Sequence, residues 1–294
     1  MSSSSGTTIV RDPDPGAAAP SAAAGRERRR RRGGGVDATV WLGRLAVLVV
    51  ILLVWHFAIE LGWVLDLYAA TPVETFQRLF ELLGDPTFWS NLRITLQETV
   101  LGWALGSSLG LIVGLLLGRW TRAARIFDPY LIFMNATPKI ALAPFFILWF
   151  GIDQTSKVML AATIVFFIVQ VPTQSAVSMV QPDLDTVATT MGATELQKFR
   201  MVVLPGIMPS VFGALRLALV YSLLAVVLGE FIASRAGLGQ ALITSTNQFD
   251  MPTAFALLIV LATLAVLINI GLAAVENHFS RWKSADMRGK TVSL

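Results

Sequence analysis

GWALGSSLGLIVGLLLG, residues 102–118, places a glycine at every fourth position of an otherwise largely apolar run. As part of the apolar stretch 96–118, it is about long enough for a helix to cross the roughly 30 Å hydrocarbon core of a bilayer. Residues four apart share one face of an α-helix, so the glycines form a smooth stripe that a second helix can approach closely. We therefore expect a helix-packing surface at Gly102, Gly106, Gly110, Gly114 and Gly118.

The composition of the whole chain indicates several such spans. Of its 294 residues, 54% are hydrophobic and 14% are charged, whereas soluble domains are about one quarter charged. Lipid offers no hydrogen-bond partners, so a span must satisfy its own backbone groups, and the short alternating strands of a barrel are absent from the sequence. The sequence predicts an all-α, polytopic membrane protein with about six transmembrane helices. The expected spans are residues 42–61, 96–118, 127–150, 157–179, 209–232 and 253–275.

The chain offers few residues for catalysis, metal binding or redox chemistry. It has no cysteine, and its two histidines, His56 and His278, lie far apart in sequence. We therefore expect no metal, no cofactor bound by this chain and no enzymatic activity of its own. The stretch SADMRGKT, residues 284–291, approaches the phosphate-binding pattern G-x-x-x-x-G-K-[ST], but Ser284 replaces its first glycine and too few residues follow for a helix.

The distribution of basic residues predicts the orientation in the cell membrane. Arginine and lysine gather in the N-terminal arm, in the loop 119–125, at 198–200 and in the tail, while the other loops carry only Arg78, Arg93, Lys157 and Arg235. Because cytoplasmic loops carry the excess of Lys and Arg, we place both termini in the cytoplasm. The net charge of +4 then reflects topology, and no nucleic-acid partner is expected.

Composition also divides the chain into three parts. Residues 1–35 are rich in Ser, Ala, Gly, Pro and Arg and contain too little apolar surface to fold. We expect a disordered, Arg-rich cytoplasmic arm at 1–35, a transmembrane domain at 36–280 and a cytoplasmic tail at 281–294. In the outer segment 62–95, Pro72 and the apolar residues that follow at helical spacing, up to Leu83, predict a short amphipathic helix.

Polar residues inside the spans are candidates for a solute pathway. The span 127–150 has three prolines, which favour kinks, and carries Asn135, Thr137 and Lys139 beside them. A lysine near mid-span is costly in lipid, so Lys139 should face a cavity, a partner or an interface, and a bent structural helix remains the alternative. Arg216 and Glu230 lie near span ends, where both could anchor helices. Alternatively, Arg216 attracts an anionic solute and Glu230 tunes the outer gate.

The coupling segment, DLDTVATTMGATELQKFRMVVLPG at residues 183–206, is charged yet half apolar and lies on the expected cytoplasmic side. Its first half has apolar residues at helical spacing up to Met191, and Gly192 is expected to end that helix. Thr194 and Gln197 fit a capping box that starts a second helix, which we expect to end near Pro205. The pattern predicts two short helices joined by a glycine corner.

This segment resembles the EAA loop of permease subunits in ATP-binding-cassette importers, whose pattern is E-A-A, three residues, G, nine residues, I, one residue, L-P. Thr186, Val187 and Ala188 fall on the E-A-A positions, with Asp185 beside them, and Gly192 on the glycine. Val202, Leu204 and Pro205 occupy the remaining positions at the family spacing. TPKIALAPFFILWFGID and GEFIASRAGLGQALITSTNQFD are similar to segments of the nitrate, sulfonate and taurine branch, and the resemblance covers about residues 70–275.

The resemblance implies a type I importer fold, two permease copies, often identical, an extracytoplasmic solute-binding protein, and a separate ATPase that holds ATP and Mg²⁺. In such importers a rigid coupling helix enters a cleft on the ATPase and transmits its movement to the pathway. The residues implied in ATPase coupling are Asp185, Thr186, Ala188, Gly192, Ala193, Thr194, Glu195, Leu196, Lys198, Phe199, Leu204 and Pro205.

Two other functions are weighed against an importer of a small, anionic solute. An ion-coupled secondary transporter would need buried carboxylates at mid-span and an inverted repeat, neither of which the spans clearly offer. A non-transporting membrane scaffold would need neither an exposed docking segment nor kinked, polar-bearing spans. Sulfonate, nitrate, taurine, a vitamin precursor and other small solutes all stay open.

Overall fold

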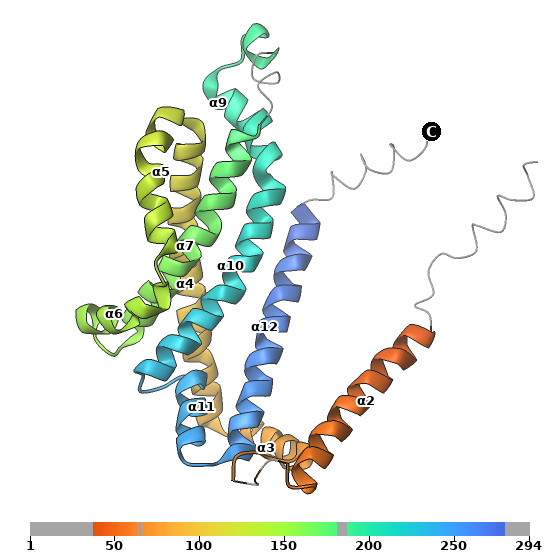
Figure 1. The fold of residues 1–294 in the computed structure, drawn as a ribbon. Coiled ribbons are helices and arrows are strands. Elements are labelled where there is room, and N and C mark those ends of the chain that lie inside the picture. Colours follow the sequence, from red (N-terminus) through yellow and green to blue (C-terminus); the bar gives the residue numbers. More distant parts are fainter. Residues whose placement is uncertain (1–37, 64, 66, 181–186, 280–294) are drawn as a thin grey trace, which may run out of the picture. The chain divides into compact units, whose positions relative to one another are not determined.

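A computed structural model describes residues 38–63, 65, 67–180 and 187–279 and shows helices joined by short loops, with no strand among the described residues (Figure 1). The predicted arm and tail, the stretch 284–291 and the coupling residues Asp185 and Thr186 lie outside this part of the chain. The all-α prediction is confirmed for the residues described.

The chain divides into two units, one ending at Val54 and one beginning at Trp55. The first unit contains most of α2 (Ala38–Glu60), an apolar helix whose large hydrophobic side chains are mostly exposed. Such a helix suits a span surrounded by lipid. All further elements belong to the second unit.

Three long helices form the centre of the second unit: α4 packs against α7, and α10 packs against both (Figure 1). The glycine stripe of α4 lies against α7. A Cβ atom at Gly106 would be 2.5 Å from the Ala162 carbonyl oxygen, and one at Gly114 would be 2.8 Å from that of Gln170. The helices are α4 (Pro86–Arg119), α7 (Gln154–Ser178) and α10 (Leu204–Ile232).

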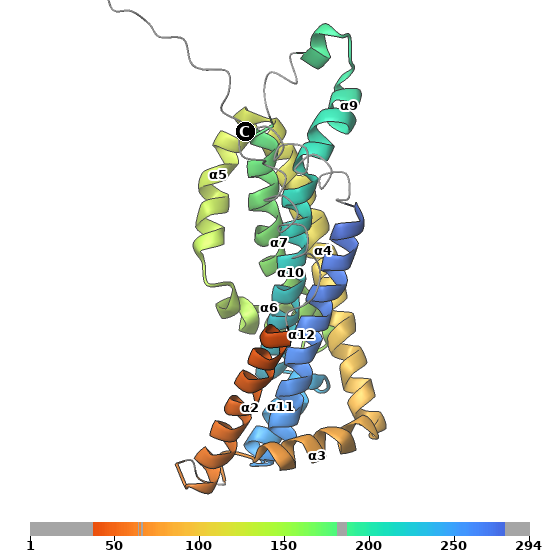
Figure 2. The same cartoon turned by 90° about the vertical axis from the view of Figure 1, so that its right-hand side faces the viewer.

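Shorter helices lie at the end of the unit opposite to α9 (Glu195–Lys198) (Figures 1 and 2). The predicted amphipathic helix is present as α3 (Pro72–Leu83), with a capping box between Thr71 and Glu74. α3 packs on α12 (Met251–Phe279), as does α11 (Leu238–Asn247). The apolar cluster beneath these helices comprises Leu82, Phe88, Leu238, Ala256 and Leu257.

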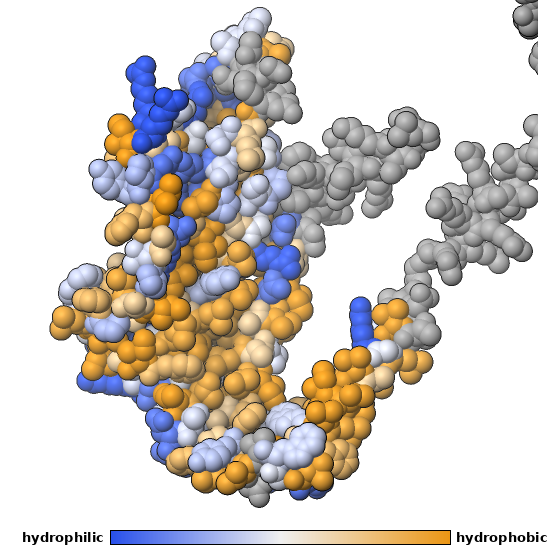
Figure 3. Space-filling view, viewed as in Figure 1, coloured by the Kyte–Doolittle hydropathy of each residue, from blue (hydrophilic) through white to orange (hydrophobic). Residues whose placement is uncertain are grey.

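Among the described residues, five helices are long and apolar enough to span a membrane, and a bent pair of helices makes a sixth span if it counts as one. The expected span at 96–118 begins earlier, because Asp85 accepts a hydrogen bond from the Thr87 N–H and Pro86 occupies the first turn, starting a helix of 34 residues. In Figure 3, strongly polar side chains gather near the end that carries α9, and hydrophobic ones dominate the middle of the face shown.

The third expected span, 127–150, is broken rather than merely kinked. α5 (Thr121–Ala136) and the helical stretch Lys139–Phe150 meet at an angle of 83°. Pro138 disfavours a helical backbone at the residue before it, and Thr137 is extended, with ψ at 134°. The stretch after the break begins as a 3₁₀ turn (Lys139–Leu142) and continues as α6 (Ala143–Phe150).

Candidate functional site

The glycine corner of the coupling segment has a defined geometry. After a helical turn at 187–190, the Gly192 N–H donates to the Thr189 carbonyl at 2.9 Å, and the Ala193 N–H donates to the Ala188 carbonyl at 3.0 Å. This pair of bonds is a Schellman motif, which needs a left-handed residue at its centre. Gly192 supplies it with φ at 80°. The corner predicted at Gly192 is therefore built by local hydrogen bonding.

The helix after the corner starts as predicted but does not end as predicted. Thr194 and Gln197 form the capping box that begins α9. The chain then passes through a π-helical turn, Phe199–Val203, directly into α10, so that one continuous helix of 38 residues runs from Glu195 to Ile232. The expected end near Pro205 is wrong, since the wide turn ahead of it removes the usual clash with the carbonyl four residues earlier.

Apolar and charged contacts fix this helix to the bundle. Phe199 and Val203 pack with Val177 at the end of α7. The Glu195 carboxylate accepts hydrogen bonds from Arg119, the last residue of α4, and from Lys198, whose Nζ lies 2.8 Å away. Glu195 precedes the span expected at 209–232. Its pKa is lowered mainly by the hydrogen bond from Lys198 and next by the hydrogen bond from Arg119.

The opposite side of the coupling segment is an exposed surface with a shallow hollow of about 450 Å³. The hollow is lined by Leu196, Gln197, Arg200 and Met201. The Leu196 side chain is 75% exposed and that of Met201 is 73% exposed, and Met191 beside the corner is also exposed. Apolar side chains are thus exposed beside the Arg200 cation on this surface.

The structure separates the predicted coupling residues by exposure. Thr194, Glu195 and Leu196 are exposed, whereas Lys198 is buried and Phe199 is half-buried. Ala188, Ala193 and Pro205 are half-buried, Gly192 is exposed, and Leu204 lies at the limit of exposure. The residues implied in ATPase coupling did not include Met191, Gln197, Arg200 and Met201. The four-residue spacing from Leu196 to Arg200 and from Gln197 to Met201 already placed these pairs on common faces.

Three pathway candidates meet at the break in the third span. Lys139 Nζ donates to the Asn135 backbone carbonyl at 2.7 Å and to its Oδ1 at 3.0 Å, and it lies 4.7 Å from the centre of the Phe167 ring. The Thr137 hydroxyl donates to the Phe133 carbonyl. Lys139 also lines a mostly apolar cavity of about 260 Å³ toward α10. The ammonium is thus held at the bend by polar and aromatic partners.

Arg216 makes contacts between two helices. Its Nε donates to Asn269 Oδ1 on α12 at 2.6 Å, and its guanidinium lies 3.7 Å from Glu276 of the same helix. These contacts support the anchoring role that the sequence left open beside a solute role.

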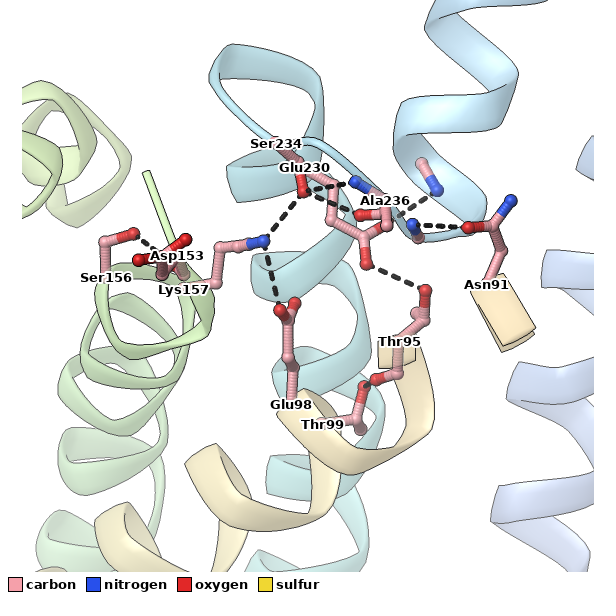
Figure 4. A network of polar contacts seen from close by, with 12 residues as sticks. Asn91, Thr95, Glu98, Thr99, Asp153, Ser156, Lys157, Glu230, Ser234 and Ala236 are labelled. Carbon is pink, nitrogen blue, oxygen red and sulfur yellow. Dashed lines mark hydrogen bonds and ion pairs between the residues drawn. The ribbon is translucent and has the colours of Figure 1, made fainter. Parts of the chain in front are cut away.

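Glu230 is fully buried and bonds to the first turn of α11 (Figure 4). Its Oε1 accepts from the Thr95 hydroxyl at 2.7 Å, and its Oε2 accepts from the Gly239 N–H at 2.6 Å. The Thr95 oxygen in turn accepts from the Leu238 N–H at 2.9 Å. Side chains at Gly237 or Gly239 would overlap the carboxylate. Glu230 therefore joins the start of α11 to α4.

An ion pair lies beside Glu230 and joins α4 to α7 (Figure 4). Lys157 Nζ is 3.0 Å from Glu98 Oε1, and it donates to the Ser234 hydroxyl at 2.7 Å. The side chains of Lys157 and Glu98 are 5% and 1% exposed, so Lys157, expected in an outer loop, is a buried residue of α7. Sequence analysis could not pair these residues because they are far apart in the chain.

Comparisons with known proteins agree with this geometry. The family model of the binding-protein-dependent transport system inner membrane component matches residues 106–283. A riboflavin transport system permease protein of Chloroflexus aurantiacus is 32% identical over 246 residues, which cover 83% of this chain and 91% of that protein. A putative aliphatic sulfonates transport permease protein of Bacillus subtilis is 29% identical over 245 residues, covering 83% and 89%.

A solved structure shares the fold. A chain of the MetNI methionine ABC transporter in an inward-facing conformation superposes with a TM-score of 0.59 over 66% of this chain and 98% of that chain. At 21% sequence identity, the match concerns the fold alone. It confirms the predicted type I importer permease architecture.

Proposed function

The chain belongs to the family of binding-protein-dependent transport system inner membrane components, and from this premise we propose that its coupling segment is the docking element for a separate ATPase. The family consists of non-catalytic permease subunits of ATP-binding-cassette transporters, so ATP hydrolysis falls to a partner. The observation that carries the proposal is the exposed surface at Leu196, Arg200 and Met201, held on a helix that continues into the bundle.

The mechanism follows from the stiffness of this helix. At about 1.5 Å per residue, the 38 residues from Glu195 to Ile232 span roughly 57 Å, longer than the bilayer core. A push on Leu196 is transmitted along the helix, because Arg119 and Phe199 tie its start to α4 and α7. Movement of the ATPase thereby changes the packing of the three central helices.

The other partners follow from the same proposal. ATP and Mg²⁺ bind the ATPase, an extracytoplasmic protein delivers the solute to the end that carries α3 and α11, and a second permease copy completes the pathway. In this orientation, the coupling segment and both termini are cytoplasmic. The relatives' names give a sulfonate for one protein and riboflavin for another, so we propose a small polar solute as the cargo. An anionic solute stays a prediction of the sequence.

Copurification of the ATPase tests the docking role. The chain is isolated from its native host in mild detergent, and the stoichiometry of an accompanying ATPase subunit is measured for the wild type, Leu196→Asp and Leu83→Asp. Leu83 is an exposed leucine of α3, so its variant adds the same charge at the other end of the molecule. We expect Leu196→Asp to lose the ATPase and Leu83→Asp to retain it. Equal retention by both variants contradicts the proposal.

A further inference from the structure

A cavity of about 600 Å³ with a partly polar lining lies between the end of α4, α5 and the second half of α7. Asp128 and Asn135 of α5 and Gln170, Gln174 and Ser175 of α7 line it together with apolar residues. The cavity lies within two of the expected spans, where polar side chains are costly unless they have partners or serve a pathway. Asn135 belongs to the break in the third span through its bonds to Lys139, but neither the break nor the coupling segment accounts for the other polar residues.

The polar side chains form a directed chain of hydrogen bonds. Gln170 Nε2 donates to Gln174 Oε1 at 2.5 Å, and Gln174 Nε2 donates to Asp128 Oδ1 at 2.9 Å. Each glutamine thus donates its amide N–H₂ to the next residue, and the chain of hydrogen bonds ends at the Asp128 carboxylate. At its other end, Gln170 Oε1 is buried and has no hydrogen-bond partner.

The unpartnered oxygen indicates a missing donor. Gln170 is 1% exposed, and a buried acceptor without a partner destabilises the fold because it has lost its hydrogen bonds to water. Turning the amide over would aim its N–H₂ away from Gln174 and place two acceptors face to face. A ligand that supplies an N–H group to Gln170 Oε1 removes this cost without disturbing the chain of bonds.

The charge of the lining points the same way. Among the residues that the structure describes, Asp128 is the one ionisable residue that lines the cavity. Lys139 is bonded to Asn135 and lines a different cavity, toward α10. An anion here would face the Asp128 carboxylate without a counter-charge, whereas a neutral or cationic group would not.

We propose that this cavity is a solute-binding chamber within each permease subunit, selective for neutral or cationic small solutes that carry N–H donors. Gln170 Oε1 accepts from the solute, and Asp128 sets the preference of the chamber for charge. The proposal deepens the importer function argued above and rests on it. The proposal also concerns the identity of the transported solute, because the Asp128 carboxylate would repel a simple anion.

The absence of cysteine from the chain allows a direct test. Ser175→Cys introduces a single thiol into the lining, in the complete permease–ATPase complex in lipid nanodiscs. Its reaction rates are measured with two methanethiosulfonates of similar size, one bearing trimethylammonium and one bearing sulfonate. The ratio of the two rates is divided by the ratio for free 2-mercaptoethanol, which removes the intrinsic difference between the reagents.

We expect the cationic reagent to be favoured at least about fivefold after this correction, because Asp128 attracts it and repels the other. Adding Asp128→Asn should bring the ratio close to one. Asp153→Asn removes a carboxylate at the start of α7, outside the cavity, and should leave the ratio unchanged. A ratio of one or below in Ser175→Cys overturns the proposal, and so does failure of both reagents to react, which would mean that lipid or a neighbouring helix fills the space.

Protection by ligands tests the donor preference separately. Millimolar 4-aminopyrimidine should slow the reaction of Ser175→Cys with uncharged N-ethylmaleimide, and ethanesulfonate should not. Adding Gln170→Leu should abolish the protection. Protection by ethanesulfonate alone refutes the assignment. These assays need no solute-binding protein and do not depend on Leu196, so their failure is distinguishable from failure of the docking role.

Discussion

Gly106→Ala is a sharp test of the packing between α4 and α7. The added Cβ would lie 2.5 Å from the Ala162 carbonyl oxygen and 2.7 Å from Val165 Cβ. The first of these atoms is backbone, so it cannot be relieved by a change of rotamer. The whole of α7 would have to move, and the other glycines of the stripe hold it at similarly short distances. The substitution therefore strains the interface along its length.

The expected magnitude follows from two opposing effects. Overpacking costs about 1–3 kcal/mol, and contact with backbone argues for the upper end. Alanine also gains about 1 kcal/mol over glycine in a helix interior. The net loss of stability should be about 2 kcal/mol. Gly213→Ala in α10 is the matched control, because its Cβ would meet nothing within 4 Å, and it should gain about 1 kcal/mol instead.

Thermal unfolding in one detergent at one scan rate measures the difference, since membrane proteins often unfold irreversibly. A gap of about 3 kcal/mol between the two variants corresponds to roughly 6–12 °C in the apparent midpoint. We expect Gly106→Ala to unfold below the wild type and Gly213→Ala to unfold at or above it. Coincident midpoints for the two variants would refute the close approach of α4 to α7.

Three further variants test single interactions. Glu230→Ala should cost about 2–4 kcal/mol, because the Thr95 hydroxyl and the Gly239 N–H lose their acceptor, and it should speed proteolysis between α10 and α11; an unchanged midpoint and cleavage rate would argue against its anchoring role. Lys157→Met should cost about 3–5 kcal/mol by leaving Glu98 buried without a partner, and adding Glu98→Leu should restore most of the loss; no recovery would show that the two side chains do not interact. Lys139→Met should lower solute uptake in proteoliposomes while ATPase coupling persists, whereas a loss of protein yield alone would assign it a structural role.

Features repeated along the chain could be predicted from the sequence. The apolar runs located the spans, although two of the helices begin well before the expected residue and the third span is broken. The spacing of Pro72 to Leu83 predicted α3, and the Thr194–Gln197 pattern predicted the start of α9. Each depends on residues within one or two helical turns of each other. Local hydrogen bonding and hydrophobic periodicity are enough to specify such features.

Features that join distant segments could not be predicted. Nothing in the sequence pairs Glu98 with Lys157, and the bond from Glu230 to the first turn of α11 depends on the packing of α10 against α11. The continuation of the helix through Pro205 was not predicted. A proline usually ends or kinks a helix, and the sequence did not reveal the π-helical turn that accommodates it here. Tertiary contacts decided each of these cases.

The continuous helix explains why the two ends of the molecule are built so differently. At one end, Leu196 and Met201 are exposed on its surface, beside a corner set by Gly192. At the other end, Glu230 is buried and hydrogen-bonded on both carboxylate oxygens. A stiff helix transmits a displacement when a partner pushes one of its ends and its other end is bonded to the element that moves. Because Glu230 bonds α10 to the first turn of α11, we expect movement at the coupling segment to reach α11 through bonds that are already formed.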